Sequence, residues 1–86
     1  MTTPRREYPT SEFAVLFPEM APEDYQQLVA SIREQGLLDP IAVWRGEVID
    51  GRHRQRACLA VGVVPLYIHL DSEADPVEYI LAKNLA

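Results

Sequence analysis

The first long apolar pattern in the chain predicts a helix over residues 22–35. Four apolar residues recur there at the spacing i, i+3, i+4 and i+7, which forms one apolar face: Tyr25, Leu28, Val29 and Ile32. Pro22 stands at a favoured first helical position, and Glu23 and Asp24 follow at the positive end of the helix dipole. Gly36 is the residue type expected just after a helix ends.

A hairpin and a second helix are predicted next. Residues 40–44 and 47–49 have the composition of strands, and the dipeptide Arg45-Gly46 between them supplies a turn. The returning strand brings the chain to Asp50-Gly51. Good helix formers then predict a helix from about residue 52 to residue 61, which ends at Gly62.

The remaining segments complete an α+β layout. Residues 65–70 alternate as a strand does, and Asp75-Pro76 combines an N-cap with a first-turn proline that opens a third helix. Residues 8–17, bounded by prolines, are expected to hold a short strand or turn. The sequence predicts one domain over residues 8–86, a small mixed sheet with about three helices, after a flexible N-terminus at residues 1–7.

Charge narrows the class of ligand. The 86 residues carry a net charge of −5, which argues against a general nucleic-acid coat because DNA affinity rests largely on phosphate neutralisation. Residues 45–56 hold four arginines against two carboxylates, a local charge of +2, so the other residues carry −7. A local basic spot on an acidic body favours a small anionic ligand. The single cysteine, Cys58, excludes an internal disulfide, and we expect a cytoplasmic protein without a membrane span.

The basic spot coincides with the predicted start of the second helix. Three arginines and a histidine fall within five residues, directly after Asp50-Gly51: Arg52, His53, Arg54 and Arg56. Backbone N–H groups in the first turn lack intrahelical partners and the helix dipole is positive there, so added arginines predict a site for phosphate or carboxylate. An ordinary helix start with solvated arginines and a capping Asp50 is the structural alternative.

Helical geometry separates the three arginines. At 100° per residue, Arg54 projects onto the apolar face with Ala57 and Val61, whereas Arg52 and Arg56 point away together. In the third helix, Asn84 lies seven residues after Val77 and so also on the apolar side. Inward polar groups must be paired or face a cavity, so we expect Arg54 and Asn84 to line one pocket.

Candidate catalytic residues are His53, Asp50 and Glu12. His53 could act as a general base if a carboxylate fixed its tautomer, and Asp50 is close in sequence. The structural alternative for His53 is a surface or capping role. Cys58 lies among apolar residues and is interpreted as a small core residue, and the two histidines lack zinc spacing, so no metal ligand is assigned.

Two blocks carry a family resemblance. The first is Ser-Ile-Arg-Glu-Gln-Gly-Leu-Leu-Asp-Pro-Ile at residues 31–41, and the second is Ile-Asp-Gly-Arg-His-Arg-Gln-Arg-Ala at residues 49–57, followed by Ala-Val-Gly-Val at residues 60–63. Together with Asn84-Leu85, they resemble the ParB/sulfiredoxin superfamily, specifically the ParB-like N-terminal domain of partition proteins. The resemblance covers residues 8–86.

The resemblance implies a nucleotide site. In ParB proteins the segment equivalent to residues 51–54 reads Gly-Glu-Arg-Arg and holds the triphosphate of CTP, and the relative of Asn84 follows a glutamate that helps to hold magnesium. Gly51, Arg52, His53, Arg54 and Asn84 would therefore bind nucleotide. This sequence has Arg52 and Lys83 where the family has carboxylates, which puts Mg²⁺ binding and CTPase or ATPase activity in doubt.

Other branches of the superfamily supply alternatives. Sulfiredoxins carry their nucleophilic cysteine at the position of Arg52, so sulfinic-acid reduction is not expected. Free-serine kinases carry Asp-Gly-His-His-Arg, which Asp50, Gly51, His53 and Arg54 match, with Glu12 as a potential acidic partner. A small-molecule kinase or nucleotidase thus stays open, as does a non-catalytic protein-interaction module.

The leading interpretation is a nucleotide- or phosphate-binding module for CTP or ATP. The resemblance links it to plasmid, phage or chromosome partition, or to the regulation of DNA transactions. It also implies self-association, and it implies DNA binding mainly through a following domain that these 86 residues lack.

Overall fold

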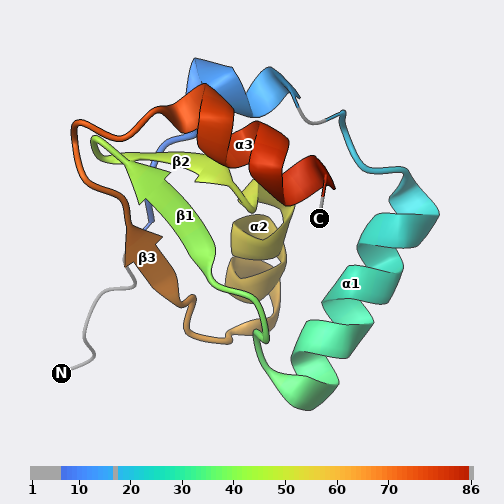
Figure 1. The fold of residues 1–86 in the computed structure, drawn as a ribbon. Helices are drawn as coiled ribbons and strands as arrows, with labels where there is room; N and C mark the ends of the chain where they lie inside the picture. Colours follow the sequence, from blue (N-terminus) through green and yellow to red (C-terminus); the bar gives the residue numbers. More distant parts are fainter. Residues whose placement is uncertain (1–6, 17, 86) are drawn as a thin grey trace, which may run out of the picture.

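A computed structural model describes residues 7–16 and 18–85, apart from the side chains of residues 15, 84 and 85. The elements are η1 (Glu12–Leu16), α1 (Pro22–Gln35), β1 (Ile41–Trp44), β2 (Glu47–Asp50), α2 (Arg52–Val61), β3 (Tyr67–His69) and α3 (Pro76–Leu85). The predicted α+β class, with a small mixed sheet and three α-helices, is confirmed (Figure 1). The expected flexible segment, except its last residue, lies outside the described residues.

The sheet has the strand order β2-β1-β3. β1 and β2 form the predicted antiparallel hairpin around Arg45-Gly46, and both turn residues have positive φ, as a tight hairpin turn requires. β3 pairs in parallel with the other side of β1. The predicted third strand shortens to three residues, and the bounds of α1 and α2 agree with the predicted helices.

The sheet separates two apolar clusters. Alternate residues of β1 point to opposite faces, so Ile41 and Val43 join the cluster on which α1 and α2 pack, while Ala42 joins Ile80 of α3 on the other side. In Figure 1, α3 crosses the face of the sheet opposite α2. The apolar face predicted for α1 is confirmed, because Ile32 is buried and its partners at the helical spacing pack against the same cluster.

The ends of the helices follow their sequence signals. Asp75 caps α3, since its Oδ1 accepts hydrogen bonds from the backbone N–H groups of Val77 and Glu78 at 3.0 and 3.1 Å. Gly62 has φ 79° and ends α2. The segment predicted as a short strand or turn contains both a single parallel bridge, from Thr10 to Val48, and the 3-10 helix η1. No helix of the described ranges is long and apolar enough to cross a bilayer.

The connection from β2 to α2 determines where the candidate site lies. β2 ends at Asp50, α2 begins at Arg52, and Gly51 alone joins them, with φ 101° and ψ 23°. A side chain is unfavourable at this positive φ, whereas glycine adopts it readily. The strand therefore turns directly into the helix, and the first turn of α2 faces the segment that joins η1 to α1.

Candidate functional site

An open cavity of about 500 Å³ lies at the start of α2. One wall consists of residues 49–54, which run from the end of β2 through the first turn of α2. The other walls come from Ala14 of η1, residues 18–21, Asp24 and Leu28 of α1, and Asp39 before β1. This volume lies within the range of about 300–1,000 Å³ that is typical of small-molecule sites.

Arg54 is held close to the backbone of Gly51. Its Nη2 donates to the carbonyl of Pro40 at 3.1 Å and pairs with Oδ2 of Asp50 at 3.3 Å. A Cβ placed on Gly51 would lie 3.0 Å from the same Nη2, so a side chain at this position would require the guanidinium to shift. Nε of Arg54 is buried and finds no acceptor among the described residues. Within the described residues, the Nε–H group of Arg54 is therefore a buried donor without a protein acceptor.

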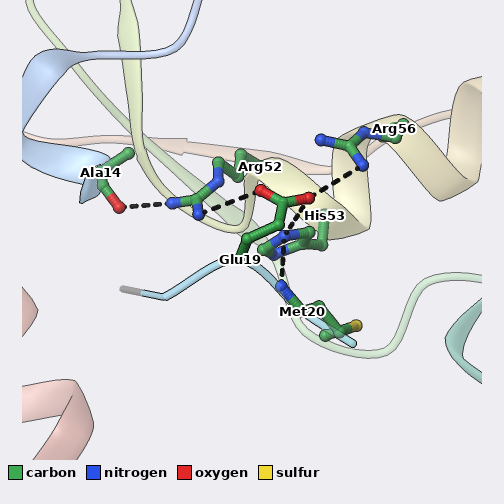
Figure 2. Close-up of polar contacts among 6 residues, drawn as sticks. All are labelled: Ala14, Glu19, Met20, Arg52, His53 and Arg56. Carbon is green, nitrogen blue, oxygen red and sulfur yellow. Dashed lines mark hydrogen bonds and ion pairs between the residues drawn. The ribbon is translucent and has the colours of Figure 1, made fainter. Parts of the chain in front are cut away.

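The other cationic side chains of α2 converge on one carboxylate (Figure 2). Glu19 contacts Arg52 at 3.4 Å through Oε2, and Arg56 and His53 at 3.3 Å each through Oε1. Arg52 is also anchored by a hydrogen bond from Nη1 to the carbonyl of Ala14 in η1. Glu19 lies in the segment between η1 and α1, so this cluster joins the start of α2 to a segment more than thirty residues earlier.

His53 uses one ring nitrogen for two neighbours. Its Nε2 accepts the backbone N–H of Met20 at 3.1 Å and lies 3.3 Å from Oε1 of Glu19 (Figure 2). An unprotonated Nε2 can accept from Met20, and only a protonated Nε2 can donate to Glu19, so the two interactions exclude each other. Burial and the charge of Arg52 lower the pKa of His53 despite the opposing effect of Glu19, which favours the Met20 hydrogen bond at neutral pH.

Glu19 remains ionised in this environment. The nearby protein raises its pKa by removing water, but the hydrogen bond from Arg56 and the positive charges of His53 and Arg56 outweigh that effect and lower the pKa. Its side chain is 61% exposed, whereas those of Arg52 and His53 are 16% and 11% exposed. Glu19 and Arg56, which is 54% exposed, are therefore the solvent-facing members of the cluster, and Arg52 and His53 are the packed members.

The structure brings most of the predicted site residues to one cavity. Five of them line it: Asp50, Gly51, Arg52, His53 and Arg54. Glu12 is exposed in η1 and is not among the lining residues, and the carboxylate that contacts His53 belongs to Glu19. Asp50 pairs with Arg54, and no side chain caps α2 within the described residues. Asn84 lies in the last turn of α3, and its side chain is outside the described part.

The common direction predicted for Arg52 and Arg56 agrees with the structure, since both contact Glu19. This side of α2 is nevertheless covered at Arg52, whose side chain is 16% exposed against 23% for Arg54. A helical projection measures direction relative to one apolar face and ignores neighbours on the other sides. Here η1 and the segment after it cover the second side of α2 and bury Arg52.

Sequence reasoning missed two polar residues. Glu19 carries no spacing signal, because its partners are far along the chain and only the fold brings them together. Gln55 is buried, unlike Glu19. Its side-chain amide donates to the carbonyl of Tyr8 at 3.0 Å, and its Oε1 accepts the backbone N–H of Tyr8 at 3.1 Å and the hydroxyl of Tyr67 at 2.6 Å. These hydrogen bonds connect the segment before η1, through Tyr8, with α2 and β3.

Cys58 does not belong to the site. It is fully buried in the cluster between α2 and the sheet, as the sequence predicted, and burial raises the pKa of its thiol. A thiol in such surroundings is a poor nucleophile. Within residues 7–16 and 18–85, no group of three or more His, Cys, Asp and Glu residues is placed to hold a metal ion.

The sequence also matches a known protein family. A family model described as the ParB N-terminal domain matches residues 10–85, a range that includes every element from η1 to α3 and all the residues that line the cavity. No curated protein matches the chain.

Proposed function

The chain belongs to the ParB N-terminal domain family, and we propose that it is a nucleotide-binding module that holds the phosphates of its ligand at the start of α2. One observation carries the proposal: the first turn of a helix presents Arg52, His53 and Arg54 to a cavity, behind a glycine that keeps the backbone open. Backbone N–H groups, the helix dipole and guanidinium groups all favour an anion at that place.

The other walls favour a nucleotide over bare phosphate. Asp24 and Asp39 line the cavity from α1 and from the segment before β1, and both are exposed. Carboxylates accept hydrogen bonds from amino and hydroxyl groups, which a base and a ribose supply. Leu28 and Ile49 add apolar surface. The proposed ligand is CTP or ATP, with its phosphates on α2 and its nucleoside toward α1.

Magnesium has little support in this proposal. The resemblance places a carboxylate where this chain has Arg52, and Arg52 lines the cavity. A positive charge there repels Mg²⁺ and attracts phosphate. We therefore propose binding that tolerates a chelator, with hydrolysis slow or absent, in a module that serves DNA partition or the regulation of DNA transactions.

Thermal unfolding with each of the four ribonucleoside triphosphates, with Mg²⁺ and with chelator, tests the proposal. A ligand at a hundred times its Kd stabilises the native state by about 2.7 kcal/mol, which raises Tm by about 10–20 °C in a domain of this size. Sodium sulfate at matched ionic strength controls for general salt effects. Shifts no larger than those with sulfate, for all four nucleotides, would reject a nucleotide site.

One observation favours a phosphotransferase as the second candidate. Glu19 contacts His53, so the motif that resembles the free-serine kinases has an acidic neighbour that could accept a proton from a substrate hydroxyl. Release of ADP from ATP, dependent on added serine and lost in His53→Ala, would favour this candidate. ATP binding without such turnover would favour the binding module.

A further inference from the structure

We propose that Glu19 is an internal competitor of the ligand: its carboxylate occupies the arginine pair that a phosphate group would use, and a phosphate binds by displacing it. This inference rests on the proposed function. It assigns to Glu19 the control of affinity, and it makes the Glu19 side chain the group that a bound phosphate releases.

The geometry supports substitution of one anion by another. The two carboxylate oxygens divide between Arg52, at 3.4 Å, and Arg56, at 3.3 Å. A phosphate group presents at least two charged oxygens and can make the same pair of contacts. Glu19 and Arg52 both line the cavity, whereas Arg56 lies outside its lining residues, so a ligand in the cavity would reach Glu19 from the side of Arg52.

The exposure of the side chains indicates which member of the Glu19 cluster can be displaced by a ligand. The Glu19 side chain is 61% exposed and the Arg56 side chain 54%, so the pair between them costs little to break. Arg52 is anchored to Ala14 and is only 16% exposed, so it stays in place when Glu19 departs. Glu19 belongs to no helix or strand, and rotation of its exposed side chain can carry the carboxylate into solvent while the hydrogen bond from Met20 to His53 is kept.

The Arg54 contacts are independent of this exchange. Arg54 pairs with Asp50 and donates to the carbonyl of Pro40, whereas Glu19 pairs with Arg52, His53 and Arg56. A first phosphate oxygen could therefore be held by Arg54 while a second group competes with Glu19. Ligands with one phosphate and ligands with several should then depend differently on Glu19, since only a longer phosphate chain reaches both places.

Glu19→Gln tests the inference by calorimetry with sodium pyrophosphate and with CTP, at fixed ionic strength. Each exposed ion pair is worth up to about fivefold in an equilibrium constant, so removing both arginine contacts should tighten pyrophosphate binding by up to about twenty-fivefold. Glu23→Gln is the matched control: it makes the same charge change on exposed α1 surface outside the cavity, and its affinity should stay within about twofold of the parent. Glu19→Asp, which keeps the charge but shortens the side chain, should fall between the parent and Glu19→Gln.

The outcomes are separable. Equal affinities for the parent and a folded Glu19→Gln would overturn the competition while leaving the phosphate site intact. Weaker binding by Glu19→Gln would make Glu19 a ligand contact, which also overturns it. Should Glu19→Gln fail to fold, the inference would be decided by whether Glu19→Asp binds more tightly than the parent. No binding of either phosphate by any variant would reject the proposed function, and the competition with it.

Discussion

Gly51→Ala probes the join between β2 and α2, where the fold and the proposed site depend on the same atoms. Gly51 has φ 101°, and a Cβ at this position would lie 3.2 Å from Cγ1 of Ile41 and 3.0 Å from Nη2 of Arg54. Gly46 provides a matched control with φ 78°. A Cβ placed there would have no heavy atom within 4 Å among the described residues, its own chain neighbours apart. Both substitutions add one methyl group at positive φ, and only one adds a clash.

The expected loss of stability follows from the positive φ, which both variants share, and from the close contacts of the added methyl group, which only Gly51→Ala has. A left-handed conformation costs a residue with a side chain about 1–2 kcal/mol, which applies to both variants. Overpacking typically costs a further 1–3 kcal/mol, and here Ile41 is fully buried and cannot move freely. The entropy that alanine removes from the unfolded chain is the same at both positions and cancels from the comparison. Gly51→Ala should thus be less stable than Gly46→Ala by about 1–3 kcal/mol.

Urea unfolding followed by the fluorescence of Trp44, the single tryptophan, measures this difference. The same samples report ligand binding: displacement of the Arg54 guanidinium should weaken pyrophosphate binding about tenfold in Gly51→Ala and leave it unchanged in Gly46→Ala. Equal unfolding midpoints for the two variants, together with equal affinities, would refute the view that Gly51 is required for the position of Arg54.

Three other changes test separate parts of the structure. Arg54→Ala should weaken nucleotide binding by about 1.5–3 kcal/mol in calorimetry, and an unchanged Kd in a folded variant would remove Arg54 from the site. The pKa of His53 is lower in the folded protein than in the unfolded chain, so as the pH falls the unfolded chain binds a proton on His53 first. The contribution of neutral His53 to the free energy of unfolding is therefore present above about pH 6.5 and is lost as the pH falls toward the folded pKa. In His53→Gln, the urea midpoint should not show this fall in stability at low pH. If the midpoints of the parent and of His53→Gln changed with pH in parallel, His53 would not be the group responsible. Cys58→Ala should lower stability by about 1 kcal/mol without changing nucleotide affinity, and loss of binding in a folded variant would place the thiol near the ligand.

The elements that the sequence predicted well are those with local signals. The helical repeat of α1, the turn at Arg45-Gly46 and the glycine after α2 are each settled by residues within a few positions of one another. The same is true of the anion-binding motif, because a glycine and three basic residues at one helix start lie together in any fold that forms that helix. These signals located one wall of the cavity.

The opposite wall could not be predicted from such signals. Glu19 stands between two prolines in a segment without periodicity, and nothing in its neighbourhood distinguishes it from Glu12 or Glu23. Its role arises because β2 and η1 pack together and bring the chain after η1 over the first turn of α2. The burial of Arg52 has the same origin. Long-range packing therefore determined both the carboxylate that sequence reasoning missed and the low exposure of Arg52.

The pairing of the arginines changes how the local charge should be interpreted. Counted along the sequence, residues 45–56 carry +2, which suggests an open basic surface. In the folded chain, Arg52 and Arg56 share Glu19, and Arg54 pairs with Asp50. Arg54 and Asp50 cancel, and Arg52, Arg56 and Glu19 together keep a charge of about +1, so the paired arginines project a weaker field into solvent than the sequence count suggests. In the proposed exchange a phosphate replaces one carboxylate, and such a site would favour a small ligand recognised by contact over DNA attracted by charge.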